Sequence, residues 1–366
     1  MNLVTSTSRE VVDHVVCTIR EPEFFAPAIR DAGYEIVDLG IAEKRPFVKA
    51  ATAFRSVVAR HKPDIIHSWL YDANVSARLA TLFSRRLPVI TSLQLPDYEP
   101  EAARIGNWHP VKVYGLRQID KVTATLKPTH FVACSAFVKK SYQLYFGIPE
   151  ERATVIYNSV NPATLKSKPG NAEAVRQSLG LPENAFLILN VGRLDPQKNH
   201  PLMFEGVKRA SAAMPNAYLL LAGVGPLEAK LKRDTANMGI GERVHFLGRR
   251  EDVADLLEAA DVFLFPSLFE GLPVALIEAM FKGLPVITSR NEILSEVVDD
   301  GRTGLLVDPN SADELAEALV KLHSQPDLRE SLGMAARNEA IFRFSVAATT
   351  AKWESLYKAV LDGQST

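Results

Sequence analysis

The chain has 366 residues, of which 47% are hydrophobic and 23% are charged, and its formal net charge is −1 at pH 7. This length predicts two domains, and the balanced charge argues against general nucleic-acid binding. No run of eighteen apolar residues occurs, and the opening segment lacks the apolar stretch of a signal peptide. The two cysteines, Cys17 and Cys134, have no disulfide or metal-ligand spacing, so we expect a cytoplasmic protein with reduced thiols.

The charge is unevenly distributed along the chain. Residues 1–163 carry 20 basic and 16 acidic side chains, whereas the remaining residues carry 22 and 27. A mildly basic first half is suited to an anionic acceptor, or to peripheral contact with the inner face of a membrane. A chance imbalance of surface charge explains the counts equally well, so both interpretations stay open.

Strand and helix patterns alternate along the first half, which indicates an α/β domain with a parallel sheet. The predicted strands are 14–19, 35–39, 65–68, 89–93, 130–133 and 154–156. Helices are predicted between them, for example over 46–61 and 74–83. A segment rich in Lys, Pro, Gly and Asn then predicts a linker over residues 164–183.

The same alternation starts again after the linker. The predicted strands are 186–191, 218–222, 244–246, 262–265, 286–288 and 304–307. We therefore predict an α/β fold of two Rossmann-like, doubly wound domains that face each other across a cleft. The domains cover residues 1–163 and 184–340, and a C-terminal helix within 341–366 is expected to pack back across the junction. Ligands of such sheets bind outside the carboxyl ends of the strands.

The loop after the first strand of the second half carries two cations. Gly192 permits a tight turn and a close approach of the backbone to a ligand. Arg193 presents a planar fork of donors suited to phosphate, and Lys198 adds a compact positive charge. Two cations on one loop after a strand predict a diphosphate clamp, and solvated surface charges are the alternative.

The next two strands also end in turns that suit a ligand. The stretch 223–226, Gly-Val-Gly-Pro, is a glycine turn that lets a helix begin near a ligand, although it is not a complete dinucleotide fingerprint. After the third strand, backbone groups near Gly248 and Arg249 are candidates for contact with the edge of a nucleobase. An ordinary surface arginine is the alternative interpretation of Arg249.

Two glutamates flank the start of the helix after the fourth strand. Glu270 lies in the preceding loop, and Glu278 lies inside the helix, five residues beyond Pro273 and about 7.5 Å farther along the axis. Free N–H groups at the helix start supply positive partial charge between them. Both acids have apolar neighbours in the sequence, which is typical of a site rather than of a solvated surface. We predict that one carboxylate contacts a sugar and the other a ribose, with phosphates between them.

Taken in order, these motifs resemble the donor domain of retaining glycosyltransferases of family 4, which have the GT-B fold. The matching residues are Gly192-Arg193-Leu194 with Lys198, the glycine turn 223–226, Phe265-Pro266-Ser267 running into Glu270-Gly271-Leu272-Pro273 and Glu278-Ala279, and Gly304-Leu305-Leu306-Val307. The stretches 134–135 and 157–161 resemble that family's approach to the crossover between domains. The resemblance covers roughly residues 60–360.

The resemblance implies a role for each of these residues. Arg193 and Lys198 would bind the donor diphosphate on the loop that begins at Gly192. Glu278 would bind the ribose hydroxyls, and Glu270 would contact the transferred sugar. The backbone at 271–272, Gly271 and Leu272, would approach the sugar and the phosphate. The predicted catalytic residues are therefore Glu270, Arg193 and Lys198.

The resemblance also implies the reaction. A sugar would pass from a UDP-, GDP- or ADP-sugar to a glycan, lipid-linked or small-molecule acceptor, with retention of anomeric configuration, in polysaccharide biosynthesis. No cofactor and no metal are expected, because the fold generally needs none and the chain has no Asp-x-Asp motif. Arg193, Lys198 and a helix N-terminus can stabilise a leaving diphosphate without a divalent cation.

The first half departs from this family's pattern. Members begin with a strand, a glycine-rich loop and a long helix, whereas this chain opens with a helix-like segment and reaches its first strand at residue 14. We expect either that Met1 lies downstream of the true start or that the enzyme is naturally shortened. Gln94 stands where many relatives carry a histidine, and it can hydrogen-bond a sugar hydroxyl but cannot titrate. For His67, at the end of another strand, a structural role is the favoured interpretation.

Two other classes of function stay open at this point. A non-catalytic nucleotide-sugar binder or partner subunit would bind the donor without turnover, and the missing acceptor loop favours it. Another enzyme with the same fold, such as an epimerase or a phosphorylase, would use the same donor residues. The intact set of Arg193, Lys198, Glu270 and Glu278 favours a transferase.

Overall fold

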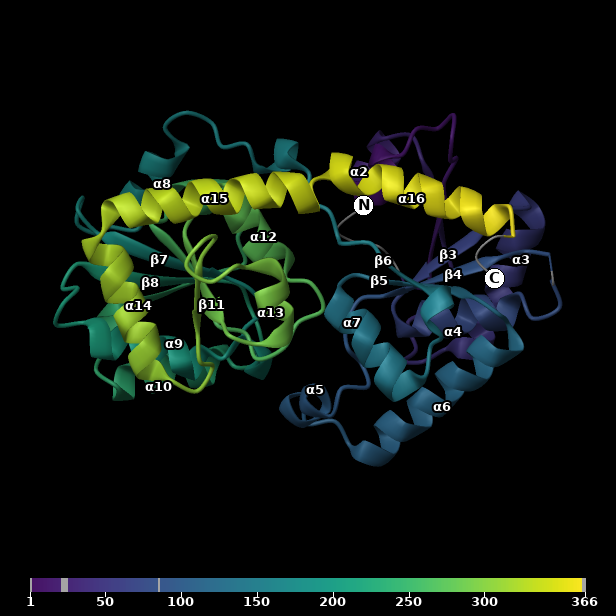
Figure 1. Ribbon diagram of the computed structural model, residues 1–366, viewed down its shortest axis with the longest axis horizontal. Helices are drawn as coiled ribbons and strands as arrows, with labels where there is room; N and C mark the ends of the chain where they lie inside the picture. Colours follow the sequence, from purple (N-terminus) through teal and green to yellow (C-terminus); the bar gives the residue numbers. More distant parts are fainter. Residues whose placement is uncertain (1, 21–25, 85, 364–366) are drawn as a thin grey trace. The chain divides into compact units, whose positions relative to one another are not determined.

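The computed structural model describes residues 2–20, 26–84 and 86–363, and the chain divides into two compact units (Figure 1). Unit 1 comprises Met1–Ser159 and Val346–Thr366, and unit 2 comprises Val160–Ser345. All ladders between the described strands are parallel, as predicted. No helix in the described ranges is long and apolar enough to cross a membrane. The expectation about a start at Met1 falls outside these ranges.

Unit 1 contains the strands predicted for the first half, each close to its predicted bounds. The strands are β1 Val15–Thr18, β2 Glu35–Asp38, β3 Ile66–Trp69, β4 Val89–Leu93, β5 His130–Ala133 and β6 Ala153–Val155. The helices are α1 Asn2–Ser6, α2 Ala26–Asp31, α3 Phe47–His61, α4 Tyr71–Ala80, α5 Pro100–Ile105, α6 Pro110–Leu126, α7 Ala136–Ser141 and α16 Val346–Leu361, with a π-helical turn Tyr142–Phe146 and a 3₁₀ turn Glu150–Arg152.

The strands of unit 1 form two separate sheets among the described residues. β1 pairs with β2, and β3, β4, β5 and β6 form a four-stranded sheet in that order. No ladder joins β1 to β3 in the part of the chain that the structure describes, so each of these strands has an unpaired edge. Unit 1 thus has a break between β1 and β3. Whether the family's first strand and glycine-rich loop are missing from this chain stays a prediction.

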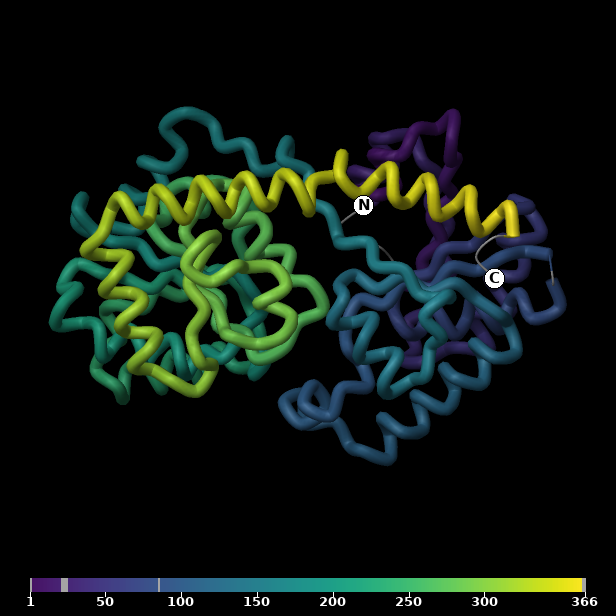
Figure 2. The backbone as a smooth tube through the Cα atoms, viewed as in Figure 1, coloured from purple at the N-terminus to yellow at the C-terminus, as the bar shows by residue number. Residues whose placement is uncertain are grey.

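Helix α16 completes the core of unit 1. Successive residues of a strand face opposite sides of the sheet, and Ile90 packs with Trp353 and Tyr357 of α16, whereas Val89 packs with Ala77 of α4 on the other side. In Figure 2 the yellow end of the tube runs beside the purple and blue chain of the first half. The last helix is therefore part of unit 1, although more than 180 residues of unit 2 precede it in the sequence.

His67 is one of the polar residues that α16 holds in place. Its Nδ1 lies 2.8 Å from the Tyr357 hydroxyl, and its Nε2 lies 2.8 Å from Ser92 Oγ. The ring stacks on Trp69 with centroids 3.5 Å apart. Burial lowers the pKa of His67 well below its ordinary value, so the ring is neutral. These contacts agree with the structural role favoured for it from the sequence.

Unit 2 is a doubly wound domain. Its strands are β7 Phe186–Val191, β8 Ala217–Ala222, β9 Val244–Gly248, β10 Val262–Phe265, β11 Val286–Ser289 and β12 Leu305–Val307. Its helices are α8 Asn171–Ser178, α9 His200–Ala210, α10 Glu228–Asn237, α11 Val253–Ala259, α12 Val274–Phe281, α13 Glu292–Val297, α14 Ala312–Ser324 and α15 Pro326–Phe344, with 3₁₀ turns at Pro162–Leu165, Pro196–Lys198 and Gly241–Arg243.

The strand order β9-β8-β7-β10-β11-β12 places a topological switch point between β7 and β10. The chain connections leave these two strands in opposite directions, and ligands of doubly wound sheets bind at the carboxyl ends of the strands at such a point. On one face of the sheet, alternate strand residues such as Ile188 and Leu264 pack against Phe204 of α9 and Leu315 of α14. Helices α8, α11, α12 and α15 lie on the other face (Figure 1). Within the predicted linker, Asn171 of α8 donates to Asp255 of α11 at 2.9 Å, so this segment is packed on unit 2.

We expect Trp353→Ala to destabilise unit 1 by about 3–5 kcal/mol, because it removes a large side chain from the core around β4. Urea unfolding followed by circular dichroism measures the change. Phe342→Ala on α15 is the control, since its side chain is 80% exposed and its removal should change the unfolding free energy by less than about 0.5 kcal/mol. Equal effects of the two substitutions would contradict the assignment of α16 to this core.

Candidate active site

The loops after β7 and β8 are joined through their backbones. The N–H of Leu194 donates to the Val224 carbonyl at 3.1 Å, and the Leu194 carbonyl accepts from the N–H of Leu227 at 3.1 Å. Gly223 has a φ of 151°, and a Cβ at this position would lie 1.9 Å from the carbonyl oxygen of Gly192. Only glycine allows this approach. The predicted glycine turn therefore fixes the shape of the loop that carries Arg193 and Lys198.

Lys198 and Glu270 form a buried ion pair between the loops that follow β7 and β10. Lys198 Nζ lies 2.5 Å from Glu270 Oε1, and the two side chains are only 13% and 8% exposed. Ser267 Oγ donates to the same carboxylate oxygen at 2.8 Å, and the ammonium lies 4.6 Å from the centre of the Phe265 ring. The other oxygen, Oε2, takes no donor from the described residues. Glu270 is thus held at the switch point with one oxygen available to a ligand.

The loop that carries Glu270 is fixed from two sides. Gln197 Nε2 donates to the Phe269 carbonyl at 2.7 Å, and the Gln197 carbonyl accepts from the N–H of Leu268 at 2.9 Å. Asn291 Nδ2 donates to the Ser267 carbonyl at 3.0 Å. The sequence did not single out Ser267, Gln197 or Asn291 as site residues. The one local signal for Asn291 is its identity as the N-cap of α13, a position that favours asparagine.

Backbone donors lie between Glu270 and helix α12. The N–H groups of Gly271 and Leu272 donate to no acceptor in the described ranges of the chain. Pro273 is the N-cap of α12. Unpaired N–H groups beside the positive end of a helix dipole attract an anion. This part of the site is therefore suited to a phosphate oxygen.

Glu278 lies in the second turn of α12 and is half-buried between the fully buried residues Ile277 and Ala279. Burial raises the pKa of Glu278 to about 7. No ion pair or hydrogen bond to its carboxylate occurs among the described residues, and burial is the one cause of the raised pKa. Hydroxyl groups that donate to a carboxylate favour its ionised form. A ribose bound here would therefore compensate for the loss of solvent around Glu278.

The two predicted arginines are on the surface of the same unit. The Arg193 side chain is 70% exposed, and its Nε lies 3.9 Å from Oδ2 of the mostly buried Asp195, which is a long ion pair. Arg249 follows β9 directly, and the Gly248 carbonyl before it accepts from the N–H of Gly223 at 2.8 Å. The structure thus brings Lys198 and Glu270 into contact and places Arg193 and Arg249 on loops at the same ends of the strands.

His200 is a buried residue beside the cation loop that the sequence did not single out. It begins α9, two residues after Lys198, and it is fully buried. Burial, and secondarily the charge of Lys198, lower the pKa of His200 to about 4. The ring is therefore neutral near pH 7 and adds no competing positive charge beside Lys198. No sequence pattern distinguished it from an ordinary residue at a helix start.

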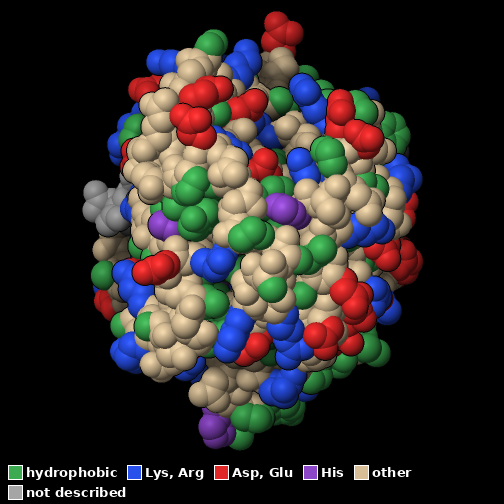
Figure 3. All heavy atoms as spheres, turned by 90° about the vertical axis from the view of Figure 1, so that its left-hand side faces the viewer, with side chains coloured by type: hydrophobic (Ala, Val, Ile, Leu, Met, Phe, Trp, Pro, Cys, Tyr) green, Lys and Arg blue, Asp and Glu red, His purple; other side chains and the backbone are tan. Residues whose placement is uncertain are grey.

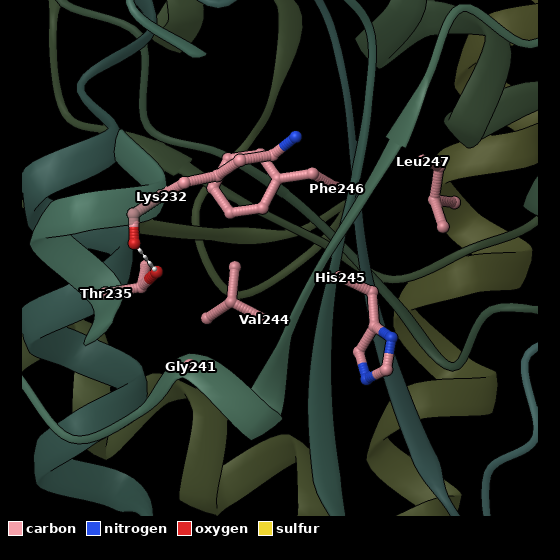
Figure 4. Close-up of a pocket in the computed structure, with 7 residues that line it drawn as sticks. All are labelled: Lys232, Thr235, Gly241, Val244, His245, Phe246 and Leu247. Atoms are coloured by element: carbon pink, nitrogen blue, oxygen red, sulfur yellow. Dashed lines mark hydrogen bonds between the residues drawn. The ribbon is translucent and has the colours of Figure 1, made fainter. Parts of the chain in front are cut away.

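A separate hollow of about 400 Å³ lies along the edge strand β9 (Figure 4). Its lining residues are Lys232, Thr235, Gly241, Val244, His245, Phe246 and Leu247. In Figure 4 His245 extends to the other side of β9 from Phe246, beside which the Lys232 amine lies. This hollow begins at the amino end of β9 and contains none of the predicted site residues. Because ligands of such sheets bind at the carboxyl ends, we place the candidate site at the switch point instead.

Both halves of the chain match known families. Residues 171–339 match the family described as Glycosyl transferases group 1, and residues 2–164 match Glycosyltransferase Family 4. The chain is 26% identical over 365 residues to an Escherichia coli UDP-Gal:alpha-D-GlcNAc-diphosphoundecaprenol alpha-1,3-galactosyltransferase, an alignment that covers 98% of this chain and 88% of that protein. It is 33% identical over 182 residues to the lipopolysaccharide core biosynthesis glycosyltransferase LpsD of Rhizobium meliloti, over 50% of this chain and 52% of that protein.

Solved glycosyltransferase structures have the same architecture. The structure of Anabaena HepE in complex with UDP and glucose matches with a TM-score of 0.83 at 21% identity, over 98% of this chain and 94% of that chain. WaaG, a glycosyltransferase involved in lipopolysaccharide biosynthesis, matches with a TM-score of 0.71 at 19% identity, over 97% and 94% of the two chains. These similarities confirm the two-domain GT-B fold predicted from the sequence.

We expect Glu278→Gln to stabilise the protein at pH 8 by about 1–3 kcal/mol, because the native carboxylate is charged there in a half-buried place. A pKa raised by folding means that the native state binds a proton more tightly, so Glu278 contributes favourably at low pH. That contribution is lost as pH rises from about 4.5 to about 7. The advantage of glutamine should therefore shrink below pH 7 and vanish by about pH 4. Urea unfolding at pH 4, 6 and 8 measures it, and a constant difference would contradict the raised pKa.

Proposed function

We propose a mechanism and an acceptor class for this chain, which belongs to glycosyltransferase family 4. The protein is a glycosyltransferase that transfers a sugar from a nucleoside diphosphate sugar, as predicted from the sequence. We infer that it retains the anomeric configuration and needs no metal ion. The buried pair of Lys198 and Glu270 at the switch point is the observation that carries this proposal.

The cations of the β7 loop bind the leaving group. Lys198 lies between two anions, the Glu270 carboxylate and the donor diphosphate, and the exposed Arg193 side chain turns onto the diphosphate. The N–H groups of Gly271 and Leu272 donate to phosphate oxygens. Charge that develops on the leaving diphosphate is then stabilised by groups already in place, which is the most effective kind of electrostatic catalysis. These positive groups neutralise the diphosphate charge, which is the role of the divalent cation in a metal-dependent enzyme.

Glu270 acts on the sugar. The bond between the anomeric carbon and the diphosphate oxygen breaks, and the bond to the acceptor oxygen forms on the same face of the ring. The acceptor proton passes to the leaving diphosphate, so no protein base is required. Glu270 stabilises the positive charge on the sugar ring through Oε2, while Lys198 and Ser267 hold Oε1.

Glu278 and the β9 loop bind the nucleoside. Glu278 accepts from the ribose hydroxyls and loses its proton when they bind, because these donors favour the carboxylate. Backbone groups beside Arg249 contact the base. Uridine donors are the first to test, because the similar HepE structures contain UDP, glucose and UDP-glucose. GDP- and ADP-sugars complete the panel.

The acceptor is a glycan, a lipid-linked sugar or a small molecule. The similar Escherichia coli enzyme acts on a sugar attached to diphosphoundecaprenol, which supports a lipid-linked acceptor for this chain. A lipid-linked acceptor requires the protein to work at a membrane surface. The excess of basic residues in 1–163 favours peripheral contact with an anionic surface.

We expect Glu270→Gln to lower the rate of nucleoside diphosphate release from the preferred donor by about 100-fold or more, since it removes the charge that stabilises the sugar cation. Donor affinity measured by calorimetry should change little, because the amide keeps the hydrogen-bonding shape of the site. Release is measured with UDP-, GDP- and ADP-sugars in the absence of added metal.

Glu228→Gln is the matched control, because Glu228 pairs with Lys232 on the surface of α10 and lies outside the site. It should leave the rate unchanged. Full activity in both Glu270→Gln and Lys198→Ala would overturn the assigned roles. Donor binding without any release in the unsubstituted protein would favour a non-catalytic binder.

We expect EDTA to leave the transfer rate within about twofold of its untreated value, because Arg193, Lys198 and backbone donors stabilise the diphosphate. Proton NMR of the product should show the anomeric configuration of the donor. A rate that disappears with EDTA and returns with Mg²⁺ or Mn²⁺ would contradict the metal-independent mechanism. An inverted product would contradict the attack from the same face.

A further inference from the structure

Helix α6 buries polar residues and exposes apolar ones, the opposite of an ordinary helix of a globular domain. Its buried residues are Asp120, Thr123 and Ala124. Its exposed side carries apolar residues spaced by eight, three and four positions, which is the spacing of one helical face. These residues are Val111, Ile119, Val122 and Leu126, with exposed fractions of 71%, 40%, 55% and 59%. An amphipathic helix of a globular domain normally turns such a face inward, so this apolar face requires another explanation.

Buried polar contacts fix the orientation of α6. Arg78 of α4 is fully buried and forms an ion pair with Asp120, and the Tyr98 hydroxyl donates to the other oxygen of Asp120 at 2.7 Å. Rotating α6 to bury its apolar face would remove Asp120 from both partners and leave the Arg78 charge buried without compensation, which is strongly unfavourable. The apolar face is therefore held toward solvent by the fold.

Further apolar side chains extend this face at both ends of the helix. Trp108 and Tyr114, near the start of α6, are 40% and 57% exposed. At the other end of α6, Lys127 Nζ donates to the Ser84 carbonyl at 2.7 Å. Phe83, the neighbour of Ser84 in the sequence, is 88% exposed. We call the set Trp108, Val111, Tyr114, Ile119, Val122 and Leu126 the α6 face.

The charged side chains of α6 and its flanking residues are mostly basic. Residues 105–128 contain four basic side chains, of which Lys127 is buried, and one acidic side chain, the buried and paired Asp120. Lys112 is exposed on the flank of the helix. By contrast, acidic and basic side chains are interspersed on the face of the molecule that Figure 3 shows. The α6 face thus combines an apolar strip and two amphipathic aromatic residues with the exposed cation Lys112 on its flank.

We propose that the α6 face docks on an anionic lipid bilayer, with its apolar side chains among the acyl chains and its cations at the head groups. Apolar area and basic residues on one helix are the features that bind such a surface, and tryptophan and tyrosine favour the interface. A second copy of the chain is a poorer occupant, because a symmetric pair would bring equal cations together. The inference rests on the proposed membrane contact and is independent of the transfer chemistry.

Vesicle sedimentation tests this docking surface on the full chain. We expect binding to vesicles of phosphatidylcholine with 30% phosphatidylglycerol by weight (about one anionic lipid in three, a composition chosen for surface charge) and little binding to phosphatidylcholine alone. Val111→Ser combined with Val122→Ser should weaken binding at least about tenfold, because four buried methyl groups are replaced by two hydroxyls. Lys112→Glu should weaken it further at low salt.

Val48→Ser is the matched control, because Val48 is 75% exposed on α3 of the same unit and lies outside the α6 face. It should bind vesicles as the unsubstituted protein does. Absence of vesicle binding, or binding unchanged by the double substitution, would overturn the inference. A dimer in sedimentation velocity that the double substitution dissociates, without vesicle binding, would show self-association instead. Donor calorimetry on the same variants distinguishes these outcomes from failure of the proposed transferase, since donor binding should be unchanged.

Discussion

The buried ion pair of Lys198 and Glu270 is the interaction around which unit 2 is arranged. Two charges removed from water are tolerated only when each is compensated, and here one carboxylate oxygen receives both the ammonium and the Ser267 hydroxyl. The pair joins loops from two strands that lie side by side but far apart in the sequence. The hydrogen bonds of Gln197 hold those two loops together, and the close approach of Gly223 to Gly192 fixes the β7 loop from the side of β8. Sheet order, glycine positions and site chemistry therefore depend on one another.

Much of this organisation could be predicted from the sequence, because it depends on local patterns. Short apolar runs such as 186–191 and 262–265 gave the strands of the central sheet, and glycine or proline after them gave the loops. The two glutamates and the two cations could be assigned to one site because parallel strands end at the same edge. What the sequence could not give was the direct pairing of Lys198 with Glu270, since a loop pattern does not specify which side chains meet. The supporting Asn291 was missed for the same reason, because its amide bridges to a loop more than twenty residues away.

Unit 1 was harder to predict, and its residues show why. Its strands were found, but the pattern does not reveal that β1 and β2 stand apart from β3 to β6. Strand pairing is decided by contacts between distant segments rather than by local sequence. Likewise, no local pattern shows that Asp120 lies on the inner side of α6, because this placement depends on Arg78 of another helix. In both units the polar groups that matter most are those whose partners come from elsewhere in the chain.

The division of unit 1 into two stretches of sequence has a consequence for biosynthesis. Ile90, Val132 and Ile156 form their core with side chains of α16, which is synthesised after all of unit 2. Unit 2 is continuous and ends at Ser345, so its whole core is available before α16 has left the ribosome. The second unit can therefore complete its fold while the first still exposes the apolar surface of its sheet. Before α16 is synthesised, unit 1 is therefore the part of the chain most prone to aggregation and the part that chaperones would protect.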